Sequence, residues 1–219
     1  MDISVKDLLD INECDAKDIF NHVVYPWDVL IKIKDFLLSY SLTLPKDFER
    51  IEEFVWVGKG TTIEKTALIK GPAIIGHNCE IRHASYIREN VIIGNNVVVG
   101  NSTEIKNAIL FNKVHVPHYN YIGDSILGYK AHLGAGVILS NFKSDGGLIK
   151  VKTDSQVIET GLRKLGAIIG DYAEIGCNSV LNPGTIVGRN SIVYPLSSVR
   201  GILQENSILK GSGNVVTKH

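Results

Sequence analysis

The sequence lacks several features that would assign it to a common class of protein. Its three cysteines, Cys14, Cys79 and Cys177, are an odd set without metal-site spacing, which argues against a disulfide framework and favours a reducing compartment. Lysine plus arginine and aspartate plus glutamate both total 23, so the basic excess typical of nucleic-acid-binding proteins is missing. The chain has no long apolar run, and its acidic N-terminus is unlike a signal peptide. We therefore expect a cytoplasmic protein that binds neither nucleic acid nor a membrane.

Common catalytic and metal-binding motifs are also missing from the sequence. It contains no GxxxxGK[ST] loop, no HExxH, no paired CxxC and no GxSxG. No feature requires a metal, so we expect no metal site. The glycine-rich signature loop of a nucleotidyltransferase is absent too, and residues 1–50 are few for such a domain, so we expect no nucleotidyltransferase domain in this sequence.

What the chain does contain is a period of six residues. A branched aliphatic side chain recurs at every sixth position, and the residue after it is often glycine. This period fits neither an α-helix nor a flat strand, and it is typical of a solenoid in which each hexad forms a short strand and a turn. Three hexads close a triangular coil, and pairing between coils places the aliphatic residues in one interior column. The series is Val57, Ile63, Ile69, Ile75, Ile81, Ile87, Ile93, Val99, Ile105, then Leu127, Leu133, Leu139, and finally Ile169, Ile175, Leu181, Val187, Val193 and Val199.

The repeat divides the chain into three parts. Residues 1–50 lack it and space their apolar residues at helical intervals, so we expect a helical cap that covers the first coil and its open strand edges; a partner-binding helix is the alternative. The β-helix takes up residues 51–201, and a tail follows at 202–219. Residues 141–167 leave the coil, and the alternation in LIKVKT after two glycines predicts a small hairpin there.

The six-residue spacing is irregular between Ile105 and Leu127, since Leu127 follows Ile122 after five residues rather than six. Polar side chains gather around this irregularity. Arg88 and Lys106 are 18 residues apart, so they should stack on consecutive coils about 5 Å apart. Two cations held that close repel each other unless they share an anion, and a phosphate suits both groups. The alternative is two unrelated solvated side chains.

Other residues of this region could take part in chemistry. His118 is a candidate general base, because neutral imidazole accepts a proton near neutral pH, or it is an ordinary surface histidine. Asn141, at the mouth of the excursion, could orient a substrate or cap a turn. Tyr121 and His132 lie in the same stretch. Cys177 follows a glycine in a regular hexad, so we expect it to be a small packing residue rather than a nucleophile.

The stretch GNSTEIKNAILFNKVHVPHYNYIGDSILGYKAHLGAGVILSNFKSDG (residues 100–146) resembles the hexapeptide acyltransferases, whose fold is a left-handed parallel β-helix. More narrowly, it is similar to the acetyltransferase half of the bifunctional enzymes that make UDP-N-acetylglucosamine. The resemblance covers about residues 55–200. Its most specific elements are H-x-x-Y-[IL]-G-D at 118–124, G-A-G at 134–136 and an asparagine at 141. We therefore expect a mainly β chain, a left-handed parallel β-helix with a short α-helical N-terminal segment.

The resemblance implies a homotrimer that uses acetyl-CoA to acetylate the amine of glucosamine-1-phosphate. It assigns His118 as the catalytic base. The sugar phosphate would be bound by Arg88, Lys106, Tyr121, His132 and Asn141, and the acetyl-CoA groove would be lined by Ala135, Cys177 and Pro195.

Three positions depart from the family pattern. His132 stands where the family usually has an asparagine near the sugar amine, Phe142 replaces a tyrosine, and Tyr194-Pro195 falls where small residues line the cofactor groove. The function that we expect is acetyl-CoA-dependent acetylation of an amino sugar phosphate, in a UDP-N-acetylglucosamine-type pathway. The alternatives are an acetyltransferase with a different sugar acceptor, and a non-catalytic β-helix that binds sugar phosphates or a partner.

Overall fold

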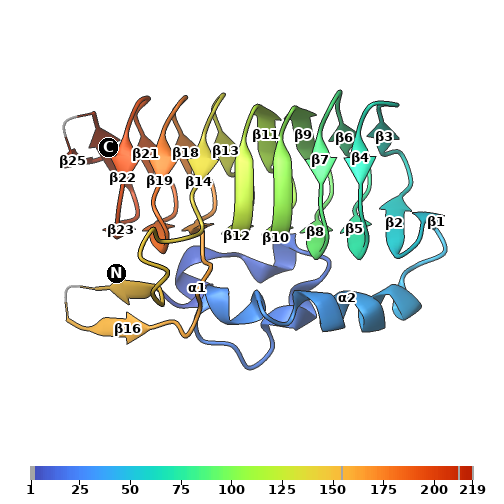
Figure 1. Ribbon diagram of the computed structural model, residues 1–219, viewed down its shortest axis with the longest axis horizontal. Coiled ribbons are helices and arrows are strands. Elements are labelled where there is room, and N and C mark those ends of the chain that lie inside the picture. Colours follow the sequence, from blue (N-terminus) through green and yellow to red (C-terminus); the bar gives the residue numbers. More distant parts are fainter. Residues whose placement is uncertain (1–2, 154, 212, 219) are drawn as a thin grey trace.

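The computed structural model describes residues 3–153, 155–211 and 213–218. Short parallel strands wind into a three-sided helix whose coils stack along one axis (Figure 1). This is the left-handed parallel β-helix expected from the sequence, and the prediction is confirmed. Aliphatic residues of the six-residue series form the interior: Ile105, Leu127, Leu139 and Ile169 are all 0% exposed.

The strands form three sides, which we number in the order in which the chain meets them. Side 1 contains β2 (Val55–Gly58), β5 (Ala73–Ile75), β8 (Val91–Ile93), the second halves of β10 (Glu104–Leu110) and β12 (Tyr121–Leu127), β17 (Ala167–Ile169), β20 (Thr185–Val187) and β23 (Ile202–Leu203). Side 2 contains β3 (Thr62–Ile63), β6 (Glu80–Ile81), β9 (Val98–Asn101), β11 (His115–His118), β13 (His132–Leu133), β18 (Glu174–Ile175), β21 (Ile192–Val193) and β24 (Ser207–Lys210). Side 3 contains β4 (Leu68–Ile69), β7 (Tyr86–Ile87), the first halves of β10 and β12, β14 (Ile138–Leu139), β19 (Val180–Leu181) and β22 (Ser198–Val199).

Side 1 differs from the other sides because its strands are apolar on both faces. Their middle residues point outward, away from the interior column, and six of them are isoleucines. Each of these isoleucines is at most 4% exposed, so something covers them. They are Ile74, Ile92, Ile109, Ile126, Ile168 and Ile186.

The N-terminal segment covers most of this apolar row. It contains α1 (Val5–Leu8), α2 (Ile33–Tyr40) and four 3₁₀ turns (Ile11–Glu13, Lys17–Phe20, Pro26–Val29 and Ser41–Thr43), and it runs beside side 1 along the axis (Figure 1). The rings of Phe20 and Phe111 meet edge to face at 5.7 Å, and the backbone N–H of Asp171 donates to the Leu8 carbonyl at 3.1 Å.

The helical part of residues 1–50 therefore does not lie over the first coil, where the sequence predicted it. The segment packs along the side because the outward isoleucines offer a larger apolar surface than the open coil end. The first coil is covered instead by β1 (Phe48–Glu52), which pairs antiparallel with β2.

The excursion forms the predicted hairpin. Its strands β15 (Lys150–Lys152) and β16 (Val157–Glu159) pair antiparallel, and Ile149 and Val151 are each 1% exposed. Ile149 packs beside Gly184, just before β20, so the hairpin covers side 1 beyond the N-terminal segment. The Thr153 N–H donates to the Gln156 carbonyl at the end of the hairpin where β15 leads to β16, so the two glycines are not the residues that connect the strands.

The β-helix also continues beyond residue 201, the boundary expected from the sequence. Strand β23 pairs parallel with β20, and β24 pairs parallel with β21. The sequence did not indicate this last coil because it is shorter than the others. Ile186 pairs with Ile202, only 16 residues later, so the six-residue period is interrupted. Strand β25 (Asn214–Thr217) pairs antiparallel with β24 and covers this end.

Candidate functional site

The irregular spacing seen in the sequence corresponds to two tight corners between sides 3 and 1. Strands β10 and β12 each run for seven residues across that corner. Asn107 and Asp124 occupy the bends with φ values of 46° and 48°, a region that Asn and Asp tolerate better than most residues. The strands pair in register, Ala108 beside Ser125, so the two bends stack directly on one another.

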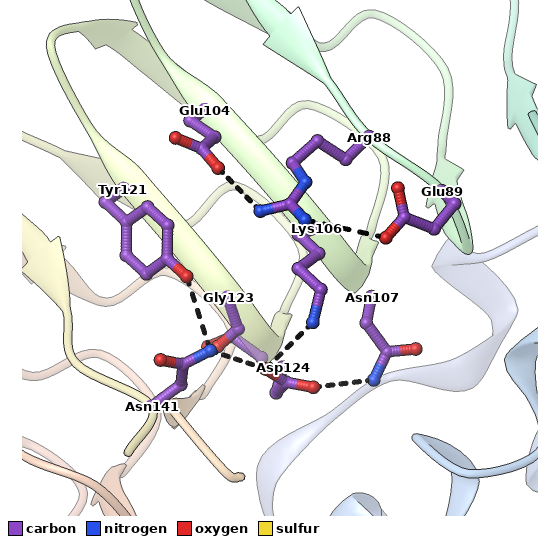
Figure 2. Close-up of polar contacts among 10 residues, drawn as sticks. Arg88, Glu89, Glu104, Lys106, Asn107, Tyr121, Gly123, Asp124 and Asn141 are labelled. Carbon is purple, nitrogen blue, oxygen red and sulfur yellow. Dashed lines mark hydrogen bonds and ion pairs between the residues drawn. The ribbon is translucent and has the colours of Figure 1, made fainter. Parts of the chain in front are cut away.

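Asp124 is the centre of a polar cluster at these corners (Figure 2). It is 5% exposed. Its Oδ1 accepts a hydrogen bond from Asn107 Nδ2 at 2.9 Å, and its Oδ2 accepts one from Asn141 Nδ2 at 2.5 Å. Lys106 Nζ lies 4.0 Å from the same Oδ2. One buried carboxylate thus holds two amides and an ammonium group.

Arg88 and Lys106 stack on consecutive coils, as the spacing predicts, since Ile87 pairs with Ile105 immediately before them. Each has a carboxylate partner. Arg88 Nη1 donates to Glu104 at 3.0 Å and Nη2 lies 3.7 Å from Glu89. The bond to Glu104 raises the pKa of Arg88 further. Its Nε is buried and has no hydrogen-bond partner within the described parts of the chain.

Tyr121 and Gly123 complete the cluster. Asn141 Nδ2 donates a second hydrogen bond, 3.3 Å long, to the Tyr121 hydroxyl. Partial burial, followed by the nearby charge of Glu104, raises the pKa of Tyr121, which keeps its phenol protonated. A Cβ at Gly123 would lie 2.6 Å from Asn141 Nδ2 and 2.8 Å from the Tyr121 oxygen. The glycine therefore leaves open the space in which these side chains lie.

A second group of predicted residues forms a column at the corner between sides 2 and 3. The N–H groups of Gly136, Asn178 and Leu196 donate to the carbonyls of the residues one coil earlier, at 3.0, 2.8 and 2.9 Å. These bonds stack the four positions in order along the axis. The column consists of His118, Ala135, Cys177 and Pro195.

His118 is exposed, and two other histidines lie close to it on side 2. His115 pairs with His132 on the next coil. Partial burial lowers the pKa of His132, charges on His115 and His118 lower it further, and Glu174 opposes the shift. His132 therefore holds a proton less readily than an isolated histidine.

The predicted residues thus fall into two groups at the two ends of side 3. Six residues separate His118 from Asp124, so they lie at most ~20 Å apart along the chain. Arg88, Lys106, Tyr121 and Asn141 belong to the Asp124 cluster, whereas His132 lies with His118. His118 is exposed, whereas the side chains of Lys106 and Asp124 are only 18% and 7% exposed.

Sequence reasoning missed the roles of Asp124, Asn107 and Glu104 in this cluster. The available signal was the five-residue step, which occurs from Ile105 to Leu110 as well as from Ile122 to Leu127. Each short step marks a corner whose residue projects a polar side chain beside Lys106.

A cavity of about 980 Å³ lies elsewhere, between the N-terminal segment, the hairpin and Arg189. None of the predicted site residues lines it. In the described part of the chain, no three His, Cys, Asp or Glu side chains are grouped so that they could hold a metal ion. None of the helices described is both long and apolar enough to cross a membrane.

Comparison with known proteins gives a consistent set of named relatives. The family model of the GMPPB C-terminal domain matches residues 69–162. The bifunctional protein GlmU of Methanococcus maripaludis is 35% identical over 211 residues, which is 93% of this chain and 50% of that protein. The chain is a hexapeptide-repeat β-helix similar to GlmU. It spans about half the length of the curated relatives that it matches over most of its own length.

Two further matches have related names. The bifunctional sugar-1-phosphate nucleotidylyltransferase/acetyltransferase of Sulfurisphaera tokodaii is 34% identical over 92 residues, or 42% of this chain and 23% of that one. A solved structure of perosamine N-acetyltransferase from Caulobacter crescentus, in complex with CoA and GDP-perosamine, is 16% identical with a TM-score of 0.41. The match covers 73% of this chain and 56% of that chain.

Proposed function

We propose that this hexapeptide-repeat protein transfers the acetyl group of acetyl-CoA to an amino sugar phosphate, with glucosamine-1-phosphate as the simplest acceptor. The observation that carries the proposal is the position of the two side-chain groups at the two ends of side 3. An acceptor that lies along this side would contact Lys106 and Tyr121 at one end and His118 at the other. The relative from Sulfurisphaera tokodaii, a bifunctional sugar-1-phosphate nucleotidylyltransferase/acetyltransferase, supports acetyl transfer as the reaction class.

In this reaction the amine nitrogen attacks the thioester carbon, and the carbon–sulfur bond breaks to release CoA. His118 accepts the proton that the amine loses, a contribution that is typically about 10²–10⁴-fold, and the proton then reaches the departing thiolate. Holding both substrates in place supplies a larger share of the acceleration. Acetyl-CoA would lie along the column of Ala135, Cys177 and Pro195, which continues from His118 in the direction of the C-terminus.

The cation pair retains donors for a phosphate although both cations already have partners. A guanidinium has five N–H donors and an ammonium has three, and the contacts to Glu104, Glu89 and Asp124 use only part of them. A ligand oxygen at this end of side 3 would accept from the N–H groups of Arg88 and Lys106 that these contacts leave unused.

The charge of the cluster favours a second candidate, in which the acceptor carries no phosphate at this position. Two cations, Arg88 and Lys106, lie beside three carboxylates, Glu89, Glu104 and Asp124, so the local charge is −1 (2 − 3). A phosphate dianion would be repelled by this excess, whereas a neutral sugar with hydroxyl or amine donors would not. The same reaction would then form an ester or an amide on a different sugar.

Both candidates are tested by measuring CoA thiol release from acetyl-CoA with a panel of acceptors. The panel pairs glucosamine-1-phosphate with glucosamine, and adds a nucleotide-linked amino sugar; mass spectrometry of the product separates N- from O-acetylation. Faster release with glucosamine-1-phosphate than with glucosamine would support phosphate recognition, and the reverse order would support the second candidate. The absence of release with every acceptor would overturn the acetyltransferase proposal and favour a non-catalytic β-helix. As a homotrimer is implied by the resemblance, the oligomeric state should be measured on the same sample.

A further inference from the structure

Asp124 is buried, charged and central to the cluster, yet the reaction proposed above gives it no role. Its side chain is 7% exposed. A carboxylate can only accept hydrogen bonds. The two amides in contact with it, Asn107 and Asn141, must therefore both turn their NH₂ groups toward it, and their orientation follows from the chemistry of the partner.

This arrangement determines which groups the cluster presents to a ligand. Because Asn141 Nδ2 is shared between Asp124 and the Tyr121 hydroxyl, its amide oxygen is left to accept; Figure 2 shows this oxygen directed away from Asp124. The Tyr121 oxygen accepts from Asn141, so its own proton is free to be donated. Lys106 supplies a second donor beside Asp124.

We propose that Asp124 is a positioning residue that sets the hydrogen-bond polarity of the acceptor pocket. It fixes Asn141 as an acceptor for a sugar hydroxyl or amine, and it holds Lys106 at the pocket as a donor. The inference rests on the proposed function, because it assigns this cluster to the acceptor and not to acetyl-CoA. Gly123 contributes by leaving the space in which Asn141 reaches Asp124.

The Asp124→Asn variant tests the proposal because it keeps the shape of the side chain and changes its polarity. The new amide has an NH₂ group in place of one carboxylate oxygen, so it cannot accept at both the Oδ1 and the Oδ2 position as Asp124 does, and Lys106 loses its counter-charge. Asp171→Asn is the matched control: Asp171 is also buried, and its carboxylate accepts from the backbone N–H groups of Asp10 and Tyr129, outside the acceptor cluster.

Steady-state kinetics of both variants are compared with those of the parent protein, with each substrate varied in turn. We expect Asp124→Asn to raise the KM for the acceptor by about tenfold and to leave the KM for acetyl-CoA unchanged, whereas Asp171→Asn lowers thermal stability without changing either KM. Equal acceptor KM values in the two variants would overturn the inference while leaving the proposed function intact. If the parent protein transfers no acetyl group, both proposals fail. Asp124→Ser, which removes the charge without adding bulk, carries the same comparison if Asp124→Asn does not fold.

Discussion

Truncation of Ile109 measures how strongly the N-terminal segment is bound to the β-helix. Ile109 is the outward residue of β10 on side 1 and is 0% exposed. Ile109→Ala removes three carbon groups at about 0.8 kcal/mol each, and the cavity left behind adds to the loss, since buried Ile→Ala changes typically cost about 2–5 kcal/mol. We therefore expect the free energy of unfolding to fall by about 2.5–4 kcal/mol.

The matched control is Ile31→Ala, in the N-terminal segment itself. Ile31 is 71% exposed, so its truncation is expected to change the free energy of unfolding by no more than about 0.5 kcal/mol. Urea unfolding followed by circular dichroism, at one protein concentration, gives both values from the shift of the midpoint at constant slope. If the two variants lose equal stability, side 1 is not covered as the structure indicates, and the account of residues 1–50 fails.

Two further predictions concern the site. Gly123→Ala is expected to raise the KM for the acceptor by roughly tenfold, because the added Cβ would lie within 2.6 Å of Asn141 Nδ2; an unchanged KM would show that Asn141 does not contact the acceptor. The pKa of His132 is below its usual value of 6.5, so the unfolded state takes up the proton first and the folded protein should lose stability as the pH falls from about 7 through 6.5 toward the lowered pKa. As the pH falls over this range, the melting temperature of the parent protein should decrease more than that of His132→Gln. A difference between the two melting temperatures that does not vary with pH would contradict the lowered pKa of His132.

Much of the fold could be predicted because the six-residue period identifies the residues that point into the interior of the β-helix. Residues such as Ile105 and Leu139 recur at fixed spacing, and each lies where the period places it. The N-terminal segment was harder to place, because its helical pattern indicates an apolar face but not the surface that it covers. The outward isoleucines of side 1, from Ile74 to Ile186, appear in the sequence as the middle residues of triplets such as AII and VII. The six-residue period accounts for the inward residue of each triplet but not for this apolar middle residue.

The site could be predicted in part for a similar reason. Coil spacing stacks Arg88 with Lys106 without any knowledge of the fold's details. The same argument could not find Glu104 and Asp124 as their partners, because contacts between side chains at a corner depend on backbone angles that the sequence does not reveal. The φ of 48° at Asp124 turns a seven-residue strand through the corner and brings its carboxylate to Asn141.

The most direct test of the central claim is the rate of CoA release by His118→Ala compared with His83→Ala. His83 is an exposed histidine in the same column, two coils earlier, where its carbonyl accepts from Ser102 N–H at 3.2 Å. With both substrates saturating and both variants shown to be folded, we expect His118→Ala to lower kcat by about 10²–10⁴-fold and His83→Ala to leave it unchanged. A full rate in His118→Ala would contradict the assignment of His118 as the base in acetyl transfer.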